Sequence, residues 1–248
     1  MKKNFAIILF TLLAPLSMRA ASMVQADSAY MVGNYDLAVT LYEQLLDQGY
    51  RSANLHYNAG NAYFRQGKLA DAIIQYERAL RIDATHQDAQ HNLAFAQAMT
   101  VDKIDAVGTI FLVDWWRYCY KQATADTWAY CSVALFVCCL CMVALFVFGK
   151  AIWLRKTGFS LAIVTLLFAV VTAFCASSRH AQLTNTNQAI VYVPTVTTKS
   201  SPDNSGNDLF ILHEGTKVII KSQLGTWSEI QTEDGNTGWL PASTIVII

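Results

Sequence analysis

Two long stretches of the chain are apolar without interruption, over residues 127–149 and 158–178, and neither holds a charged side chain. A helix needs about 20 apolar residues to cross a bilayer. Each stretch therefore predicts a transmembrane helix. The short loop that joins them, residues 150–157, is basic and is expected on the cytoplasmic side.

A shorter apolar run lies at the start of the chain. Lysines precede it, and small residues follow it. A charged start, a short apolar run and small residues are typical of an export signal. We therefore expect residues 1–22 to be a signal peptide, cleaved after Ala20, Ser22 or Ala26. The alternative is an uncleaved membrane anchor.

Residues 23–100 carry an internal repeat with a period of 34 residues. Gly33 aligns with Gly67, and Tyr42 aligns with Tyr76. Each glycine marks a turn between two helical patterns. A 34-residue period of paired helices resembles the tetratricopeptide repeat. We expect two copies, followed by an incomplete third copy that acts as a capping helix.

An aromatic segment precedes the first transmembrane stretch, within residues 101–126. Adjacent tryptophans next to tyrosine and arginine are typical of a helix that lies in the membrane interface. We expect Trp115, Trp116 and Trp128 at that interface. The alternative is an ordinary helix packed under the repeat.

After a polar linker over residues 179–187, residues 188–248 alternate short apolar runs with turn residues. The dipeptide Asp234-Gly235 predicts a hairpin turn. Short strands separated by glycine and proline favour a small barrel. The strands are expected over residues 189–193, 209–212, 218–221, 227–232 and 237–240.

Composition fits a membrane protein and excludes other classes. Hydrophobic residues make up 54% of the chain, and charged residues only 15%. Eighteen basic and eighteen acidic residues give no net charge, so the electrostatic footprint of a nucleic-acid binder is missing. The six cysteines lie in or beside the apolar stretches, which argues against a disulfide framework.

The C-terminal region resembles the bacterial SH3-like (SH3b) domain. The matching segments are residues 199–202, 212–218, 227–230 and 234–240. The predicted fold is a multidomain membrane protein with α-helical tetratricopeptide repeats, two transmembrane helices and a small all-β SH3-like barrel. Tyr192, Trp227 and Trp239 are expected in the barrel core or on a ligand face, and the sequence leaves both open.

The order of the segments resembles the BatE family, the tetratricopeptide and SH3b membrane proteins of the Bacteroides aerotolerance (Bat) operon family. The resemblance covers nearly the whole chain. It implies an envelope protein that acts with other Bat proteins, including membrane proteins of the von Willebrand A type. With the export signal, it places both soluble domains on the periplasmic side of the bacterial inner membrane.

In tetratricopeptide arrays the first helix of each repeat lines a concave groove. The Asn61 amide could bind a peptide backbone, and Arg65 could hold a carboxylate. The alternative is that both are ordinary consensus and surface residues. By the family pattern, the groove positions are Asn54, Tyr57, Asn61, Phe64, Arg65, His91 and Phe95.

No set of catalytic residues emerges from the sequence. The C-terminal region has no cysteine, so a Cys–His pair cannot form there. The three histidines of the repeat region have no carboxylate at metal-ligand spacing, and no glycine-rich phosphate loop follows a strand. We therefore expect no enzyme activity, no cofactor and no metal.

Three functions remain open at this stage. The first is a scaffold that binds partner membrane proteins through the groove and the SH3-like domain. The second is a membrane-anchored module that binds peptidoglycan peptides. The third is a redox or stress sensor that uses Cys138, Cys139 and Cys141, although cysteine thiols in hydrocarbon are poorly reactive and small-residue packing is the alternative.

Overall fold

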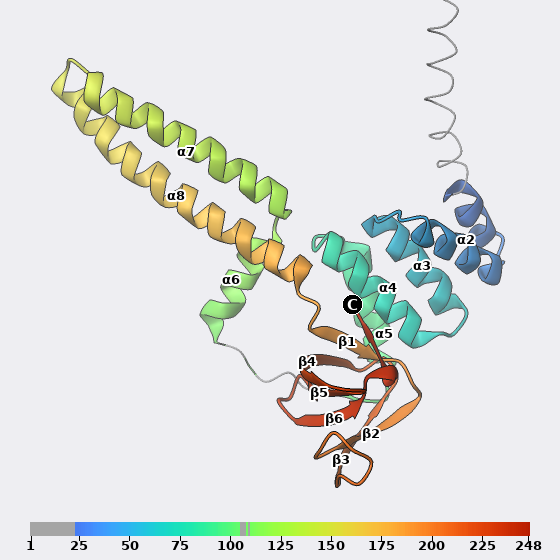
Figure 1. Ribbon diagram of the computed structural model, residues 1–248. Coiled ribbons are helices and arrows are strands. Elements are labelled where there is room, and N and C mark those ends of the chain that lie inside the picture. Colours follow the sequence, from blue (N-terminus) through green and yellow to red (C-terminus); the bar gives the residue numbers. More distant parts are fainter. Residues whose placement is uncertain (1–22, 105–107, 109) are drawn as a thin grey trace, which may run out of the picture. The chain divides into compact units, whose positions relative to one another are not determined.

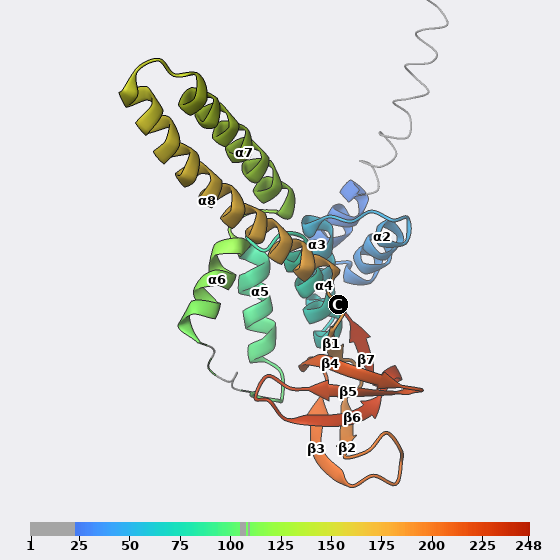
Figure 2. The same cartoon turned by 60° about the vertical axis from the view of Figure 1, so that its left-hand side comes forward.

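The computed structural model describes residues 23–104, 108 and 110–248. The predicted signal peptide lies outside the described residues. The chain divides into two compact units. One holds the repeat helices and the C-terminal strands, and the other holds the apolar helices. Figures 1 and 2 show these elements from two sides.

The repeat region consists of a helix whose described part covers residues 23–31, followed by four more helices. Their bounds are α2 (Tyr35–Asp47), α3 (Ala53–Arg65), α4 (Leu69–Ile82) and α5 (Gln87–Ala98). Side chains of Asn34, Ser52 and His86 accept a hydrogen bond from the first turn of α2, α3 and α5. Such caps satisfy backbone N–H groups that the helix itself leaves without partners.

Glycines are required in this region for two reasons, a turn with a positive φ angle and a close approach between helices. Gly33 and Gly67 adopt φ angles of 80° and 77° in equivalent turns of the two repeats. Gly60 packs under the Tyr76 ring, where an added Cβ would come within 2.7 Å of ring carbons. The helices α3 and α4 therefore cross closely only because residue 60 has no side chain.

The second unit is formed by α6 (Phe111–Lys121), α7 (Ala125–Phe148) and α8 (Ile152–Thr184). Helices α7 and α8 run side by side (Figure 1) and are long and apolar enough to cross a membrane. Gly158 faces the α7 backbone, where a Cβ would lie 2.9 Å from the Met142 carbonyl oxygen. Small residues allow this close approach between apolar helices, and large apolar side chains cover the outer surface of the pair.

The C-terminal strands form one antiparallel sheet of seven strands in the order β3-β2-β6-β5-β4-β1-β7. Its buried core contains Val191, Leu212, Val218, Ile230 and Leu240. The edge strands, β3 and β7, are not paired with each other in the described sheet, so the sheet is open. The bounds are β1 (Gln188–Val191), β2 (Thr195–Lys199), β3 (Asp208–His213), β4 (Lys217–Leu224), β5 (Trp227–Gln231), β6 (Thr237–Pro241) and β7 (Ile245–Ile247), with a short 3-10 helix, η1 (Ala242–Thr244).

The predicted fold class is confirmed at this level: repeat helices, two candidate membrane helices and a small all-β domain. Two strands were not anticipated. The β2 strand is rich in threonine rather than aliphatic residues, and the β7 strand is only three residues long. Neither gives a strong apolar alternation.

Candidate functional site

The predicted groove residues lie on α3 and α5, and hydrogen bonds join α3 to the helix over residues 23–31 and to α5. The rings of Phe64 and Phe95 meet edge to face with centroids 5.8 Å apart, which joins α3 to α5. Tyr57 lies between Tyr76 and His86, at centroid distances of 6.2 and 4.8 Å. The aromatic side chains therefore form two packed groups, Phe64 with Phe95 and Tyr57 with Tyr76 and His86, rather than isolated exposed rings.

A pair of hydrogen bonds fixes the carboxylate of Asp27. The hydroxyl of Tyr42 donates to its Oδ1 atom at 2.6 Å, and the amide of Asn58 donates to the same atom at 3.1 Å. Burial, followed by this hydrogen bond, raises the pKa of Tyr42 above its ordinary value. The Tyr42 hydroxyl therefore keeps its proton and acts as the donor.

The same arrangement recurs one repeat later around Asn61. Its Oδ1 atom accepts hydrogen bonds from the Tyr76 hydroxyl and the Asn92 amide, both at 2.8 Å. Burial raises the pKa of Tyr76 as well. Asn61 is thus held in place by two neighbours, and its position is structural as well as exposed to the groove.

A cavity of about 250 Å³ opens between the first two groove helices. It is smaller than pockets for drug-sized ligands, which are roughly 300–1,000 Å³, so its size suits a single side chain. The lining residues are Asp27, Tyr30, Met31, Tyr42, Asn58 and Asn61.

The remaining predicted groove residues lie in three different settings. The Arg65 guanidinium stacks over the Tyr35 ring, 4.9 Å from its centroid, which holds it to one side. The Asn54 amide oxygen lies 3.1 Å from Nε2 of His86, the residue that caps α5. His91 and Phe95 are exposed.

The sequence interpretation named no groove residue on the first helix of the first repeat. Asp27, Tyr30 and Met31 line the cavity, yet none was singled out. The signal was available, because Asp27 precedes Asn61 by one repeat length of 34 residues. Alignment of the copies backwards from the second repeat identifies the position.

The other titratable groups of the repeat are structural. His56 is buried, and its Nδ1 atom lies 2.7 Å from the Gln75 amide oxygen. Burial lowers the pKa of His56, which keeps the ring neutral. Within the described part of the chain, no group of three or more His, Cys, Asp or Glu residues is placed to hold a metal ion.

A second surface of interest lies on the β domain. Trp227 and Trp239 are half-buried and stand outside the buried core, on the face of β5 and β6 opposite Ser228, Ile230 and Leu240. Trp239 is in register with Glu229 on β5 and with Lys199 on β2.

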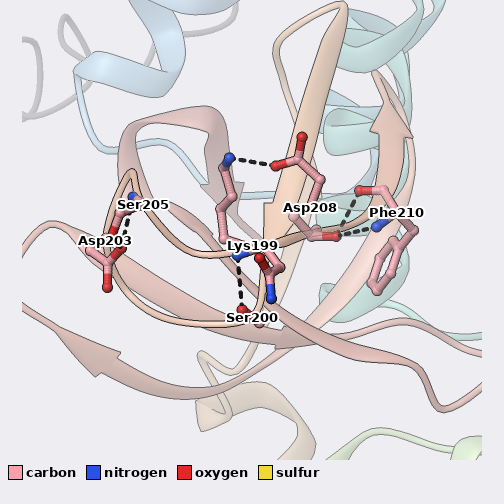
Figure 3. Close-up of polar contacts among 8 residues, drawn as sticks. Lys199, Ser200, Asp203, Ser205, Asp208 and Phe210 are labelled. Carbon is pink, nitrogen blue, oxygen red and sulfur yellow. Dashed lines mark hydrogen bonds and ion pairs between the residues drawn. The ribbon is translucent and has the colours of Figure 1, made fainter.

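The loop between β2 and β3 begins at Lys199, which is in register with Trp239, and it is closed by its own polar contacts (Figure 3). Lys199 and Asp208 form an ion pair at its base. Within the loop, the Asp203 carboxylate accepts hydrogen bonds from the backbone N–H and the hydroxyl of Ser205 at 2.8 and 2.6 Å. The loop is thus held in one shape by its own residues.

Tyr192, the third aromatic residue, lies in a different place. Its hydroxyl shares a hydrogen bond with the Asp71 carboxyl of α4. Burial raises the pKa of Asp71, and this hydrogen bond partly offsets the rise. Tyr192 therefore contributes to contact between the repeat region and the β domain.

That contact is extensive and involves both polar and apolar groups. Asp102, beyond α5, accepts hydrogen bonds from the His213 backbone N–H at 2.7 Å and from the Thr216 hydroxyl at 2.6 Å. Lys217 and Glu77 form an ion pair at 2.7 Å. Ile190 and Ile248 are buried in the same apolar cluster as the repeat helices. The repeat region and the β domain therefore share part of one core.

The sequence analysis also singled out tryptophans and cysteines of the second unit, the first for the membrane interface and the second for a redox role or for packing. Trp115 is exposed, Trp116 packs against Tyr120, and the Trp128 indole donates to the Tyr120 carbonyl oxygen at 3.0 Å. Cys139 is buried against α8, with its sulfur 3.4 Å from the Ala162 carbonyl oxygen, whereas Cys138 and Cys141 are exposed on α7. All six cysteines are free.

Comparison with known proteins supports the assignment of the repeat. A model of the tetratricopeptide repeat family matches residues 23–87. A comparison with curated proteins gave no match. The repeat region is therefore of tetratricopeptide type, and repeats of this kind form concave surfaces that bind other proteins.

Proposed function

We propose that the protein is a non-enzymatic scaffold of the bacterial envelope, which binds partner membrane proteins through the groove of its repeat region. The supporting observation is the groove itself. Its polar side chains are fixed by paired hydrogen bonds, and its aromatic side chains pack against one another in two groups. A surface that is already ordered loses little conformational entropy when it binds a partner.

The proposed location is supported by the apolar helices α7 and α8 and by the export signal expected from the sequence. In this proposal α7 and α8 anchor the chain in the inner membrane, and both soluble domains lie on the periplasmic side. Helix α6 lies in the interface of that leaflet. Its exposed Phe111, Leu112 and Trp115 enter the lipid, and Arg117 and Lys121 stay near the headgroups.

The partners we propose are other components of Bat operons, above all membrane proteins of the von Willebrand A type. This proposal rests on the resemblance of the segment order to the BatE family. The short groove limits what a partner can present. Among the described residues three helices line it, so a peptide segment or a single helix would fill it.

The test is affinity capture of the full-length protein from gently solubilised native membranes. Asn61 is a poor choice for substitution, because two neighbours bond to it. Arg65→Ala and Phe95→Ala change exposed groove side chains instead. We expect the double variant to fold normally and to lose a defined membrane protein that the wild type recovers.

A matched control is Gln44→Ala, which changes an exposed residue on α2, outside the groove helices. This variant should recover the partner as the wild type does. Recovery of the same proteins by the groove variant, or of no membrane protein by the wild type, would contradict the scaffold proposal.

A second candidate function is supported by the half-buried aromatic face of the β domain. Trp227 and Trp239 lie outside the core, and Trp239 is in register with Lys199 at the base of the β2–β3 loop, so this face could bind a peptidoglycan peptide. Retention of the full-length protein on purified sacculi, lost in Trp239→Ala, would favour this function. Equal retention of the two proteins, or none, would exclude it.

A further inference from the structure

The groove contains two copies of one polar arrangement, and the copies differ in one residue. Asp27 corresponds to Asn61, Tyr42 to Tyr76, and Asn58 to Asn92, each pair being 34 residues apart. In both copies a tyrosine hydroxyl and an asparagine amide donate to a single Oδ1 atom. Only the acceptor residue changes, from a carboxylate in the first copy to an amide in the second.

The difference changes what each copy offers to a ligand. With Oδ1 engaged, Asp27 retains its second carboxylate oxygen, Oδ2, as an acceptor, and Asn61 retains its Nδ2 group as a donor. Both residues line the same cavity. The cavity therefore offers a negatively charged acceptor at one side and a neutral donor at the other.

No ion pair compensates the carboxylate within residues 23–104, 108 and 110–248, since none of the ion pairs of these residues includes Asp27. Arg65, the basic residue of the neighbouring α3, is stacked over Tyr35 and acts electrostatically on Tyr30 of the lining, but it forms no ion pair with Asp27. A partly buried carboxylate without an ion-pair partner favours a cationic ligand.

The shape and the other walls fit a long basic side chain. The cavity measures about 250 Å³, and Tyr30 and Met31 form part of its lining. Lysine and arginine side chains pack their methylene groups along apolar surface while the charged end reaches a polar partner. An aromatic wall adds attraction for the cation itself.

We propose that Asp27 makes this cavity a specificity pocket for a lysine or arginine side chain of the partner segment. The inference rests on the proposed function, and it names the chemistry of the partner. The basic side chain enters between the helix over residues 23–31 and α3, and its charged group pairs with Oδ2 of Asp27. The Asn61 Nδ2 group donates to a backbone carbonyl of the same segment, and Phe64 and Phe95 contact its apolar side chains.

The experiment uses the full-length protein in lipid nanodiscs and a library of short random peptides. The peptides are acetylated at the N-terminus and amidated at the C-terminus, so that only side chains carry charge. We expect selected peptides to share a lysine or arginine at one position and apolar residues at others. An enriched peptide should bind the wild type roughly ten- to hundredfold more tightly than it binds Asp27→Asn, which corresponds to one charge-assisted hydrogen bond.

Asp27→Asn is a conservative probe, because the second repeat already uses asparagine at the equivalent position with the same two donors. Circular dichroism should show an unchanged helix content. The converse variant, Asn61→Asp, should strengthen the preference for basic peptides. A further library with free N-termini distinguishes a terminal amine from a side chain as the bound cation.

The outcomes separate the two proposals. Selection of peptides without a basic preference, or the same basic preference in Asp27→Asn, overturns the pocket assignment and leaves the groove as a peptide-binding surface. Failure of the wild type to select any peptide overturns the groove as the binding surface, and the pocket assignment with it. Enrichment that depends on a free N-terminus assigns the cavity to a terminal amine and contradicts the side-chain proposal.

Discussion

The groove and the contact with the β domain are built from the same repeats but differ in how their polar groups are used. In the groove, Asp27 and Asn61 each engage Oδ1 within the chain, whereas neither Oδ2 of Asp27 nor Nδ2 of Asn61 bonds to another described residue. At the contact, Glu77 of α4 and Asp102 bond to the β domain. The contact therefore uses its polar groups within the chain, and the groove keeps some polar atoms available to a ligand.

This contrast shows why a residue type alone does not mark a binding site. Tyr192 was expected either in the barrel core or on a ligand face, and its hydroxyl bonds to Asp71 of the repeat region. Asp27 drew no attention in the sequence, yet it lines the cavity. Asp27 has partners within the chain for Oδ1, but no described residue donates a hydrogen bond to its Oδ2.

The largest effect on this contrast is expected from Gly215→Ala. Gly215 adopts a φ angle of 84°, and an added Cβ would lie 2.8 Å from Thr100 and 3.0 Å from Ile73 of the repeat region. Backbone strain and the clash together should destabilise the packing of the β domain on the repeat region by about 2–3 kcal/mol. Hydrogen exchange of β1 and β4 measures the change.

The control for this substitution is Gly225→Ala. Gly225 also has a positive φ angle, of 60°, but nothing lies within 4 Å of its added Cβ. It should show the backbone strain alone, about 1 kcal/mol. An equal loss of stability in the two variants would mean that the clash of the added Cβ with the repeat region contributes nothing to the loss in Gly215→Ala.

The next largest effect is expected when the tyrosine hydroxyl is removed from each of the two polar arrangements of the groove. Tyr42→Phe removes a hydrogen bond to a carboxylate and should cost about 2 kcal/mol, whereas Tyr76→Phe removes one to an amide and should cost about 1 kcal/mol. Hydrogen exchange of α2 and α3 reports the first, and that of α3 and α4 the second. A larger cost for Tyr76→Phe would contradict a charged acceptor at Asp27.

A smaller effect is expected at the ion pair between Glu77 and Lys217. Both side chains are partly accessible to solvent, at 11% and 22%. A double-mutant cycle with Glu77→Gln and Lys217→Met should give a coupling energy of about 0.5–1 kcal/mol. High salt should reduce it. A coupling energy of zero at low salt would show that this ion pair does not stabilise the contact between the repeat region and the β domain.

The smallest effect at neutral pH concerns Asp102. Burial acts to raise the pKa of Asp102, but hydrogen bonds from Thr216 and His213 outweigh it and hold the pKa below the ordinary value of 3.8. A lowered pKa in the folded state adds stability above pH 3.8, which is lost as the pH falls through the folded-state pKa.

Thermal unfolding followed by circular dichroism between pH 7 and pH 2 tests this dependence. The melting temperature of the wild type should fall more steeply below pH 3.8 than that of Asp102→Asn. Parallel curves for the two proteins would show that Asp102 is not stabilised by its neighbours.

Local patterns predicted much of the fold. The repeat period gave the helix pairs, uninterrupted apolar stretches gave α7 and α8, and the glycine turn gave the hairpin at Asp234. The contact of Asp102 with His213 was out of reach, because the two residues are 111 positions apart and no local pattern links them. The hydrogen bond of Tyr192 to Asp71 could not be predicted for the same reason, because the two residues are far apart in the sequence.

The assignment of Asn61, Phe64 and Phe95 to the groove stays a prediction, and the structure places them on α3 and α5. The fixing of Asn61 by Tyr76 and Asn92 depends on side-chain geometry across three helices, which spacing alone does not determine. For Arg65 the sequence left two interpretations open, a carboxylate-binding residue or an ordinary surface residue, and its stacking on Tyr35 is a tertiary contact that sequence spacing does not show.

The most direct test of the central claim is site-specific photo-crosslinking in native membranes. A photoreactive amino acid replaces His91 in the groove in one variant and Gln44 on α2 in another, both at exposed positions. The account predicts a crosslink to a membrane protein from position 91, absent from position 44 and lost when Phe95→Ala is added. Crosslinks of equal strength from both positions, or from position 44 alone, would contradict a scaffold that works through its groove.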